Sequence, residues 1–159
     1  VFRVLEEINE VVKILQSAAD QAVVDIKVTH GKAVKPTLTY KGDVVRFRQV
    51  ILNLLTNAIE AYPDQATEND QAREVELSIE YTRSELHLRV TDHGTGVPAE
   101  HQTKIFNPFY TTKKHGTGIG LFIVKQVVEH DFAGSLAMTT SDQGTSFDVS
   151  LPKVPRADT

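Results

Sequence analysis

The chain has 159 residues, of which 40% are hydrophobic and 24% are charged, a composition that predicts one folded domain with a sizeable core. The net charge is -4 and the basic residues are scattered, so we expect no nucleic-acid partner. Cysteine is absent, which excludes disulfides and thiolate metal sites, and no apolar run reaches the length of a membrane span.

The first half of the chain alternates helical and extended patterns. Apolar residues recur at three- and four-residue spacing over 4–19, which predicts an amphipathic helix. Short strands are predicted at 24–28 and 38–40, where apolar residues alternate with polar ones. Asp43 follows Gly42 as an N-cap signal and predicts a long helix over 44–61.

The helix at 44–61 carries two asparagines on one face. At 100° per residue, Asn53 and Asn57 lie opposite the apolar side that contains Phe47, Leu54 and Ala58. Asparagine is unfavourable inside a helix by roughly 0.5 kcal/mol relative to alanine. Two explanations remain open at this point, a solvated helix face or a functional pair.

Two inward polar residues follow from strand alternation. Residues 75–81 and 86–90 predict an antiparallel hairpin, and its period of two continues to Asp92, which should point inward. The alternation of Phe147, Val149 and Leu151 places Thr145 inward in the same way. Asp92 is either a core aspartate bonded to backbone or the reader of a ligand's amino group. Glycine turns beside both residues favour a ligand pocket, and Pro98 should begin a short helix.

The segment 105–114 is aromatic and then basic and shows no period, so we interpret it as a lid that includes a lysine able to reach phosphate. Glycines alternate at 116, 118 and 120 and lead into a helical pattern over 121–128. Such a run can cradle phosphates with backbone N–H groups, or it can form a tight loop before a buried helix. Its spacing matches neither the dinucleotide fingerprint nor the P-loop.

Four short motifs therefore stand in a fixed order: Asn53-Leu54-Leu55-Thr56-Asn57-Ala58, Asp92-x-Gly94-x-Gly96, Phe106-x-Pro108-Phe109 and Gly116-x-Gly118-x-Gly120-Leu121. Together they resemble the catalytic ATP-binding domain of sensor histidine kinases, of the GHKL ATPase superfamily. The residues around Pro108 are most similar to the nitrogen-regulator branch. The resemblance implies a catalytic domain over 1–152, followed by a frayed tail at 153–159. It implies an α/β (α+β) two-layer sandwich of the Bergerat type, with a mixed, mostly antiparallel sheet and helices on one face.

The resemblance also implies ATP and Mg²⁺ as cofactors and gives roles to individual residues. Asp92 would accept a hydrogen bond from the adenine amino group, with Thr145 beside the base. Asn57 would bind Mg²⁺ through its side-chain oxygen. Asn53 and Lys113 would be the catalytic residues, at the metal-phosphate end and on the γ-phosphate. The other nucleotide-binding residues that it implies are Gly94, Gly96, Phe109, Thr111, Thr112, Gly116, Thr117, Gly118, Gly120 and Leu121.

The implied activity is transfer of the γ-phosphate to a histidine. None of the six histidines of this chain has the sequence setting of the family's acceptor, so we expect the acceptor on a separate dimerisation domain of the same protein. The expected partners are that domain and a downstream response regulator, in a full-length homodimer. We expect a cytoplasmic domain without membrane contact, in a parent protein that a membrane anchor could hold.

Two departures from the family pattern keep alternatives open. Glu60 stands where many relatives carry lysine, so phosphate neutralisation would fall to Arg46 or Lys113. The turn His130-Asp131-Phe132-Ala133-Gly134 replaces a more usual His-Gly-Gly. One alternative is a nucleotide-binding regulatory module without transfer activity. The other is an ATP-hydrolysing GHKL protein, which would need a glutamate where this chain has Asn53.

Overall fold

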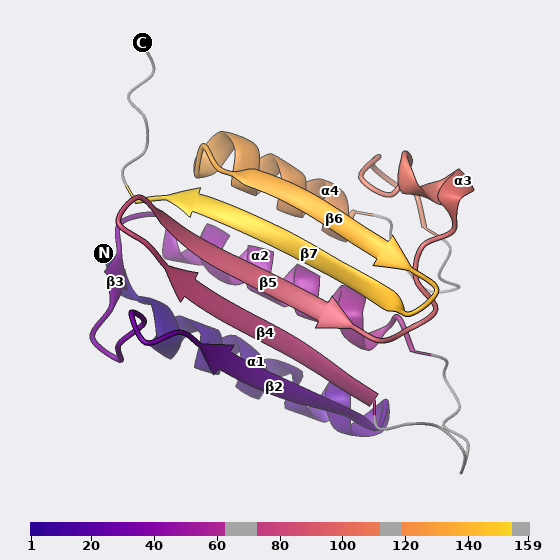
Figure 1. Ribbon diagram of the computed structural model, residues 1–159, viewed down its shortest axis with the longest axis horizontal. Coiled ribbons are helices and arrows are strands. Elements are labelled where there is room, and N and C mark those ends of the chain that lie inside the picture. The colour runs from indigo at the N-terminus through magenta and orange to yellow at the C-terminus, as the bar shows by residue number, and fades with distance from the viewer. Residues whose placement is uncertain (63–72, 112–118, 154–159) are drawn as a thin grey trace.

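The computed structural model describes residues 1–62, 73–111 and 119–153. They form two layers, in which α1, α2 and α4 cover one face of a five-stranded sheet (Figure 1). The elements in chain order are β1 (Phe2–Arg3), α1 (Val4–Gln21), β2 (Val24–His30), β3 (Thr39–Tyr40), α2 (Val44–Ile59), β4 (Arg73–Tyr81), β5 (Glu85–Asp92), α3 (Ala99–Gln102), α4 (Gly120–Gln126), the π-helical turn η1 (Val127–Asp131), β6 (Ser135–Ser141) and β7 (Gly144–Pro152).

The main sheet has the strand order β2-β4-β5-β7-β6. Only β2 and β4 run parallel, and every other neighbouring pair is antiparallel. A parallel pair needs a crossover between its strands, and here the crossover contains α2. This arrangement confirms the expected mixed, mostly antiparallel sheet with helices packed on one face.

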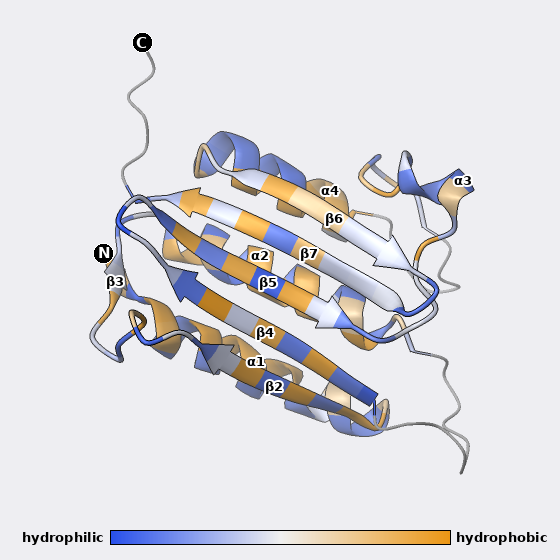
Figure 2. Cartoon of the chain, in the orientation of Figure 1, coloured by the Kyte–Doolittle hydropathy of each residue, from blue (hydrophilic) through white to orange (hydrophobic). Residues whose placement is uncertain are grey.

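The core lies between the sheet and the helices. Apolar residues of β4, β5 and β7 alternate inward as the period of two predicts, and Figure 2 shows this alternation along β4 and β5. Opposite them, the apolar side of α2 is buried, which confirms the predicted helix face. The fully buried side chains of these elements include Phe47, Ile51, Leu54, Leu55, Leu77, Ile79, Leu86, Leu88 and Leu151.

The long helix α2 begins as its sequence predicts. The Asp43 carboxylate accepts hydrogen bonds from the backbone N–H groups of Val45, at 2.9 Å, and Arg46, at 3.2 Å. These two bonds satisfy donors that the first helical turn leaves unpaired. The helix ends at Ile59 with Glu60 as its C-cap, two residues earlier than predicted.

Three local features differ from the sequence predictions. Strand β1 pairs with β3 in a separate two-stranded sheet, and two residues are too few to show alternation. Pro98 precedes α3 instead of beginning it, because its ψ of 146° is extended. The last helix continues beyond Gln126 as the π turn η1, in which Val127 and Val128 are both buried.

No helix in the described ranges combines the length and apolar character needed to cross a membrane. The predicted loop at 64–71 lies outside the described residues, as does the predicted tail apart from Lys153.

Candidate functional site

Asp92 and Thr145 face each other across neighbouring strands. Asp92 ends β5 and pairs in register with Thr145 of β7, and the two residues are only 3% and 6% exposed. The Gly94 N–H donates to Asp92 Oδ1 at 2.9 Å, and the Thr145 hydroxyl lies 2.9 Å from that of Thr140 on β6. The structure therefore confirms that both polar residues point inward, as alternation predicted.

Two glycines allow the backbones around this pair to touch. Gly144 has φ of +133°, and a Cβ there would lie 2.1 Å from the Asp92 carbonyl oxygen. Gly96 has φ of +78°, and a Cβ there would lie 1.9 Å from the Ser141 carbonyl oxygen. Any other residue would be both strained and obstructed at these positions. The glycine turn after β5 thus packs directly onto the β6–β7 hairpin.

The first of the two asparagines of α2, Asn53, lies beside the start of α4. Both are half-buried, and Asn53 donates its side-chain N–H to the Gln49 carbonyl oxygen at 2.8 Å. That bond leaves Asn53 Oδ1 directed towards Gly120, where a Cβ would lie 3.1 Å from it. A fully solvated face does not describe this side of the helix.

Helix α2 connects the two groups of residues. A Cβ at Gly94 would lie 2.6 Å from the Ala61 carbonyl oxygen, just beyond the end of α2. Gly120 meets the same helix at Asn53, so the two contacts are separated by eight residues, or about 12 Å along a helix axis. Asn57 lies between them. The residues predicted to bind the base, Asp92 and Thr145, and those predicted to bind metal and phosphate, Asn53 and Asn57, thus lie along one helix. We call the two groups the predicted base end and the predicted metal end.

Comparison with known proteins agrees with this arrangement. A family model described as histidine kinase-, DNA gyrase B- and HSP90-like ATPase matches residues 42–155, well over half of the chain. The chain belongs to this ATPase family. The match begins immediately before α2 and includes both glycine turns, so it covers every residue predicted to bind nucleotide.

Relatives with sequence similarity are sensor kinases. Sporulation kinase A of Bacillus subtilis is 31% identical over 92% of this chain and 22% of its own length. The sensory histidine kinase/phosphatase NtrB of Rhodobacter capsulatus is 34% identical over 76% of this chain and 35% of its own. The chain thus spans about a fifth to a third of these relatives. They confirm the resemblance to sensor histidine kinases, including the nitrogen-regulator branch.

A solved structure confirms the fold. The catalytic domain of the histidine kinase ThkA, in a nucleotide-free form, superposes with a TM-score of 0.82 at 28% identity and covers 97% of this chain and 95% of its own. Nearly every described element of this ATPase domain therefore has a counterpart in a histidine kinase catalytic domain.

For three other predicted site residues the structure gives burial, packing or a backbone angle, and five lie outside the described residues. Phe109 is 74% exposed with φ of +66°, and Thr111 is exposed. Leu121 is half-buried and packs against the core of the ATPase domain. The predicted residues Thr112, Lys113, Gly116, Thr117 and Gly118 lie outside the described residues.

Arg46, considered above for phosphate neutralisation, lies at the far end of α2 from Asn57. It lies in the first turn of α2, eleven residues before Asn57 and about 16 Å away along the axis. Its guanidinium donates to Gln49 at 3.0 Å and lies 3.7 Å from Asp131. Phosphate neutralisation by Arg46 stays a prediction, which this distance from Asn57 and the contact with Asp131 disfavour.

The sequence did not single out two further residues at the base end. The Thr140 hydroxyl accepts from the Val97 N–H at 2.9 Å and donates to the Gly144 carbonyl oxygen at 3.3 Å. Its position opposite Thr145 in the hairpin could have indicated it. The Tyr62 hydroxyl accepts from the His93 N–H at 2.9 Å, and no local pattern predicts that contact.

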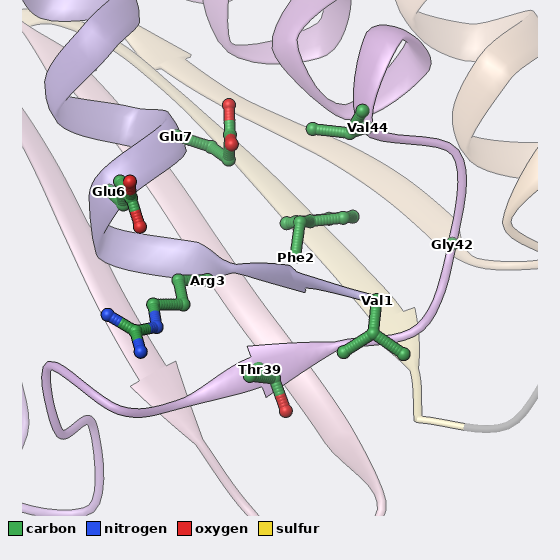
Figure 3. A pocket seen from close by; sticks show the side chains of 8 residues that line it. All are labelled: Val1, Phe2, Arg3, Glu6, Glu7, Thr39, Gly42 and Val44. Atoms are coloured by element: carbon green, nitrogen blue, oxygen red, sulfur yellow. The ribbon is translucent and has the colours of Figure 1, made fainter.

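A pocket of about 500 Å³ lies elsewhere on the ATPase domain (Figure 3). It opens beside β1 and the first residue of α2, so it lies at the opposite end of that helix from Asn57. None of the residues predicted to bind nucleotide lines it. Its lining residues are Val1, Phe2, Arg3, Glu6, Glu7, Thr39, Gly42 and Val44.

Proposed function

We propose that this domain binds Mg-ATP and donates the γ-phosphate to a histidine on a separate dimerisation and acceptor domain. The observation that carries the proposal is the buried pair of Asp92 and Thr145, placed beside the helix that holds Asn53 and Asn57. Membership of the ATPase family supports ATP as the substrate. The histidine kinase relatives support a histidine as the acceptor.

Base recognition falls to Asp92. A carboxylate can only accept hydrogen bonds at neutral pH, so it favours the exocyclic amino group of adenine over the carbonyl that guanine carries there. The Gly94 N–H holds Oδ1 in place, and Thr145 supplies a hydroxyl on the neighbouring strand. This donor and acceptor set predicts a preference for ATP over GTP.

Residues of α2 and of the segments that follow it would bind the metal and the phosphates. Asn57 offers a neutral, hard oxygen, which is a ligand type that Mg²⁺ accepts. Asn53 lies one turn earlier and faces the start of α4, where it would position the phosphate end. Lys113 would offset charge on the γ-phosphate, and the backbone of residues 116–121 would contact phosphate oxygens. Bound Mg²⁺ would stabilise the charge that develops during transfer.

Transfer is favoured over hydrolysis. The side chain of Asn53 is an amide, so it has no basic group that could activate water in the way a glutamate would. The attacking atom would be a histidine nitrogen of the acceptor domain. Within the described residues, both ring nitrogens of His87 already have partners, Ser150 at 2.9 Å and Glu85 at 3.0 Å.

The wider setting belongs to the same proposal. The structure of ThkA with the response regulator TrrA shows such a complex for that kinase, and this chain covers 41% of the kinase chain. We propose an analogous regulator here, a homodimer formed by the acceptor domain, and a cytoplasmic location for the domain, whether or not the parent protein has a membrane anchor.

A phosphotransfer assay tests this function. The domain should bind Mg-ATP and transfer radiolabelled phosphate to a purified acceptor domain of the same protein. Asn57→Ala should abolish transfer while Asn9→Ala, a matched change on the exposed side of α1, should not. Stoichiometric acid-labile phosphate on this chain alone would show that one of its own histidines is the acceptor and that the proposed division is wrong.

The same assay decides a second candidate. Glu60 is an exposed C-cap residue where many relatives carry lysine, and its negative charge near the metal helix favours a regulatory module that binds nucleotide without transferring it. Tight Mg-ATP binding with no labelled acceptor would support that module. Restoration of transfer by Glu60→Lys would then identify the residue responsible.

A further inference from the structure

Tyr62 links the end of α2 to the two strands at the base end of the site. Its hydroxyl donates to the Glu74 carbonyl oxygen on β4 at 2.6 Å and accepts from the His93 N–H at 2.9 Å. His93 immediately follows Asp92. The Tyr62 phenol therefore connects the segment that follows α2 to the start of β4 and to the turn after β5.

The ring of Tyr62 is also held in place. The Arg73 guanidinium lies 5.7 Å from the ring centroid, and Arg73 donates to the Ala22 carbonyl oxygen at 3.1 Å. Burial raises the pKa of Tyr62, and the nearby Asp92 carboxylate raises it further. The phenol therefore stays protonated at neutral pH and remains a donor to Glu74.

Packing or a hydrogen bond holds the backbone of each of the three residues 92–94, where β5 leads into the glycine turn. The Asp92 carbonyl oxygen packs against Gly144, the His93 N–H is bound by Tyr62, and Gly94 packs against Ala61. The first and third contacts depend on the absence of a Cβ. The second is a hydrogen bond to a side chain from outside the turn, whereas the Gly94 N–H donates within the turn to Asp92. The Tyr62 hydroxyl can therefore be removed without obstructing the backbone and without changing Asp92.

We propose that Tyr62 is a positioning residue for base recognition. By binding the N–H group after Asp92, it fixes the peptide that sets the direction of the Asp92 carboxylate. It also ties that peptide to the end of the helix that carries Asn57. This inference rests on the proposed function, because it assumes that Asp92 reads the base.

Tyr62→Phe tests the role, since it keeps the ring and removes only the hydroxyl. Loss of one hydrogen bond to a positioning group should weaken ATP binding by about threefold to tenfold. GTP binding should change less, so the ratio of the two dissociation constants should fall. The magnesium dependence of ATP binding should persist, because Asn57 is unchanged.

Tyr40→Phe is the matched control. Tyr40 is buried, and its hydroxyl also donates to a backbone carbonyl oxygen, that of Pro152. It lies at the other end of the sheet, so its loss should lower stability and leave the ATP to GTP ratio unchanged. Both nucleotides bind only folded protein, so partial unfolding weakens the two apparent affinities by the same factor.

A double-mutant cycle with Asp92→Asn completes the test. If Tyr62 acts through Asp92, the two changes should be non-additive in the ATP to GTP ratio, whereas Tyr40→Phe and Asp92→Asn should add. An unchanged ratio in Tyr62→Phe, or additivity with Asp92→Asn, would overturn the positioning role. Absence of any ATP preference in the unmodified domain would instead overturn the proposed function, and this inference with it.

Discussion

The proposed base end of the site lies on neighbouring strands, whereas the proposed metal and phosphate end lies where α2 meets the start of α4. At the base end, Asp92 and Thr145 are paired by the register of β5 and β7, and Gly144 contacts the Asp92 backbone. At the other end, Asn53 meets Gly120 through a side-chain oxygen.

The difference lies in what fixes each residue. A strand register fixes backbone positions through a ladder of hydrogen bonds, so a residue at the base end cannot move without disturbing the sheet. At the other end, the position of the Asn53 side-chain oxygen has fewer such constraints. We therefore expect changes at the base end to affect stability and binding together, and changes at the metal end to affect binding alone.

The largest effect should come from Gly144→Ala. The φ of +133° is unfavourable for alanine, and the new Cβ would lie 2.1 Å from the Asp92 carbonyl oxygen. Strain and obstruction together should lower the free energy of unfolding by roughly 2–5 kcal/mol. Denaturant unfolding measures this. Gly31→Ala is the control, because the atoms nearest to its Cβ would belong to the flexible end of the Glu80 side chain. An unaffected Gly144→Ala variant would contradict the rigid base end.

Asp92→Asn should remove the preference for ATP over GTP. Replacing a charged acceptor by an amide removes a hydrogen bond to a charged group, which should weaken ATP binding by about 10- to 100-fold. Competition titration with both nucleotides measures it. Asp148→Asn is a suitable control, because Asp148 lies on β7 and pairs with Arg89 away from the site. Equal affinity of the unmodified domain for ATP and GTP would exclude the assigned role.

Gly120→Ala should separate binding from stability at the metal end. The new Cβ would lie 3.1 Å from Asn53 Oδ1, which must shift by a few tenths of an ångström. Stability should change little, because the better helix propensity of alanine, by about 1 kcal/mol over glycine, offsets the cost of this shift. Mg-ATP binding should weaken by about threefold to tenfold if Asn53 positions phosphate. Scanning calorimetry measures the stability and titration calorimetry measures the affinity for Mg-ATP. A loss of stability without a loss of affinity would contradict the proposed difference between the two ends.

The smallest effect should come from Ala133→Gly, outside both ends. Ala133 has φ of +52° in the turn after η1, where the Gly134 N–H donates to the Val128 carbonyl oxygen at 2.8 Å. Glycine adopts this conformation without strain, so the variant should be more stable by about 0.5–1 kcal/mol. Thermal unfolding measures the gain, and unchanged nucleotide affinity is expected. A destabilised variant would show that the alanine methyl group packs usefully in this turn.

The sequence alone determined the features that depend on local periodicity. Alternation along β5 and β7 predicted that Asp92 and Thr145 point inward, and the 3.6-residue period placed Asn53 and Asn57 on one face of α2. These predictions succeed because a side chain's direction follows from its position in a regular element. The order of four motifs predicted the family, since motifs are local too.

Only the tertiary structure decided which segments distant in the sequence come into contact. The contacts of Gly144 with Asp92, of Gly94 with Ala61 and of Tyr62 with His93 join segments whose separation along the chain carries no periodic signal. The same holds for the ion pair of Arg46 with Asp131, which joins the first turn of α2 to the end of η1. Close packing of the two layers fixes such contacts, and it depends on the whole core and not on any single stretch.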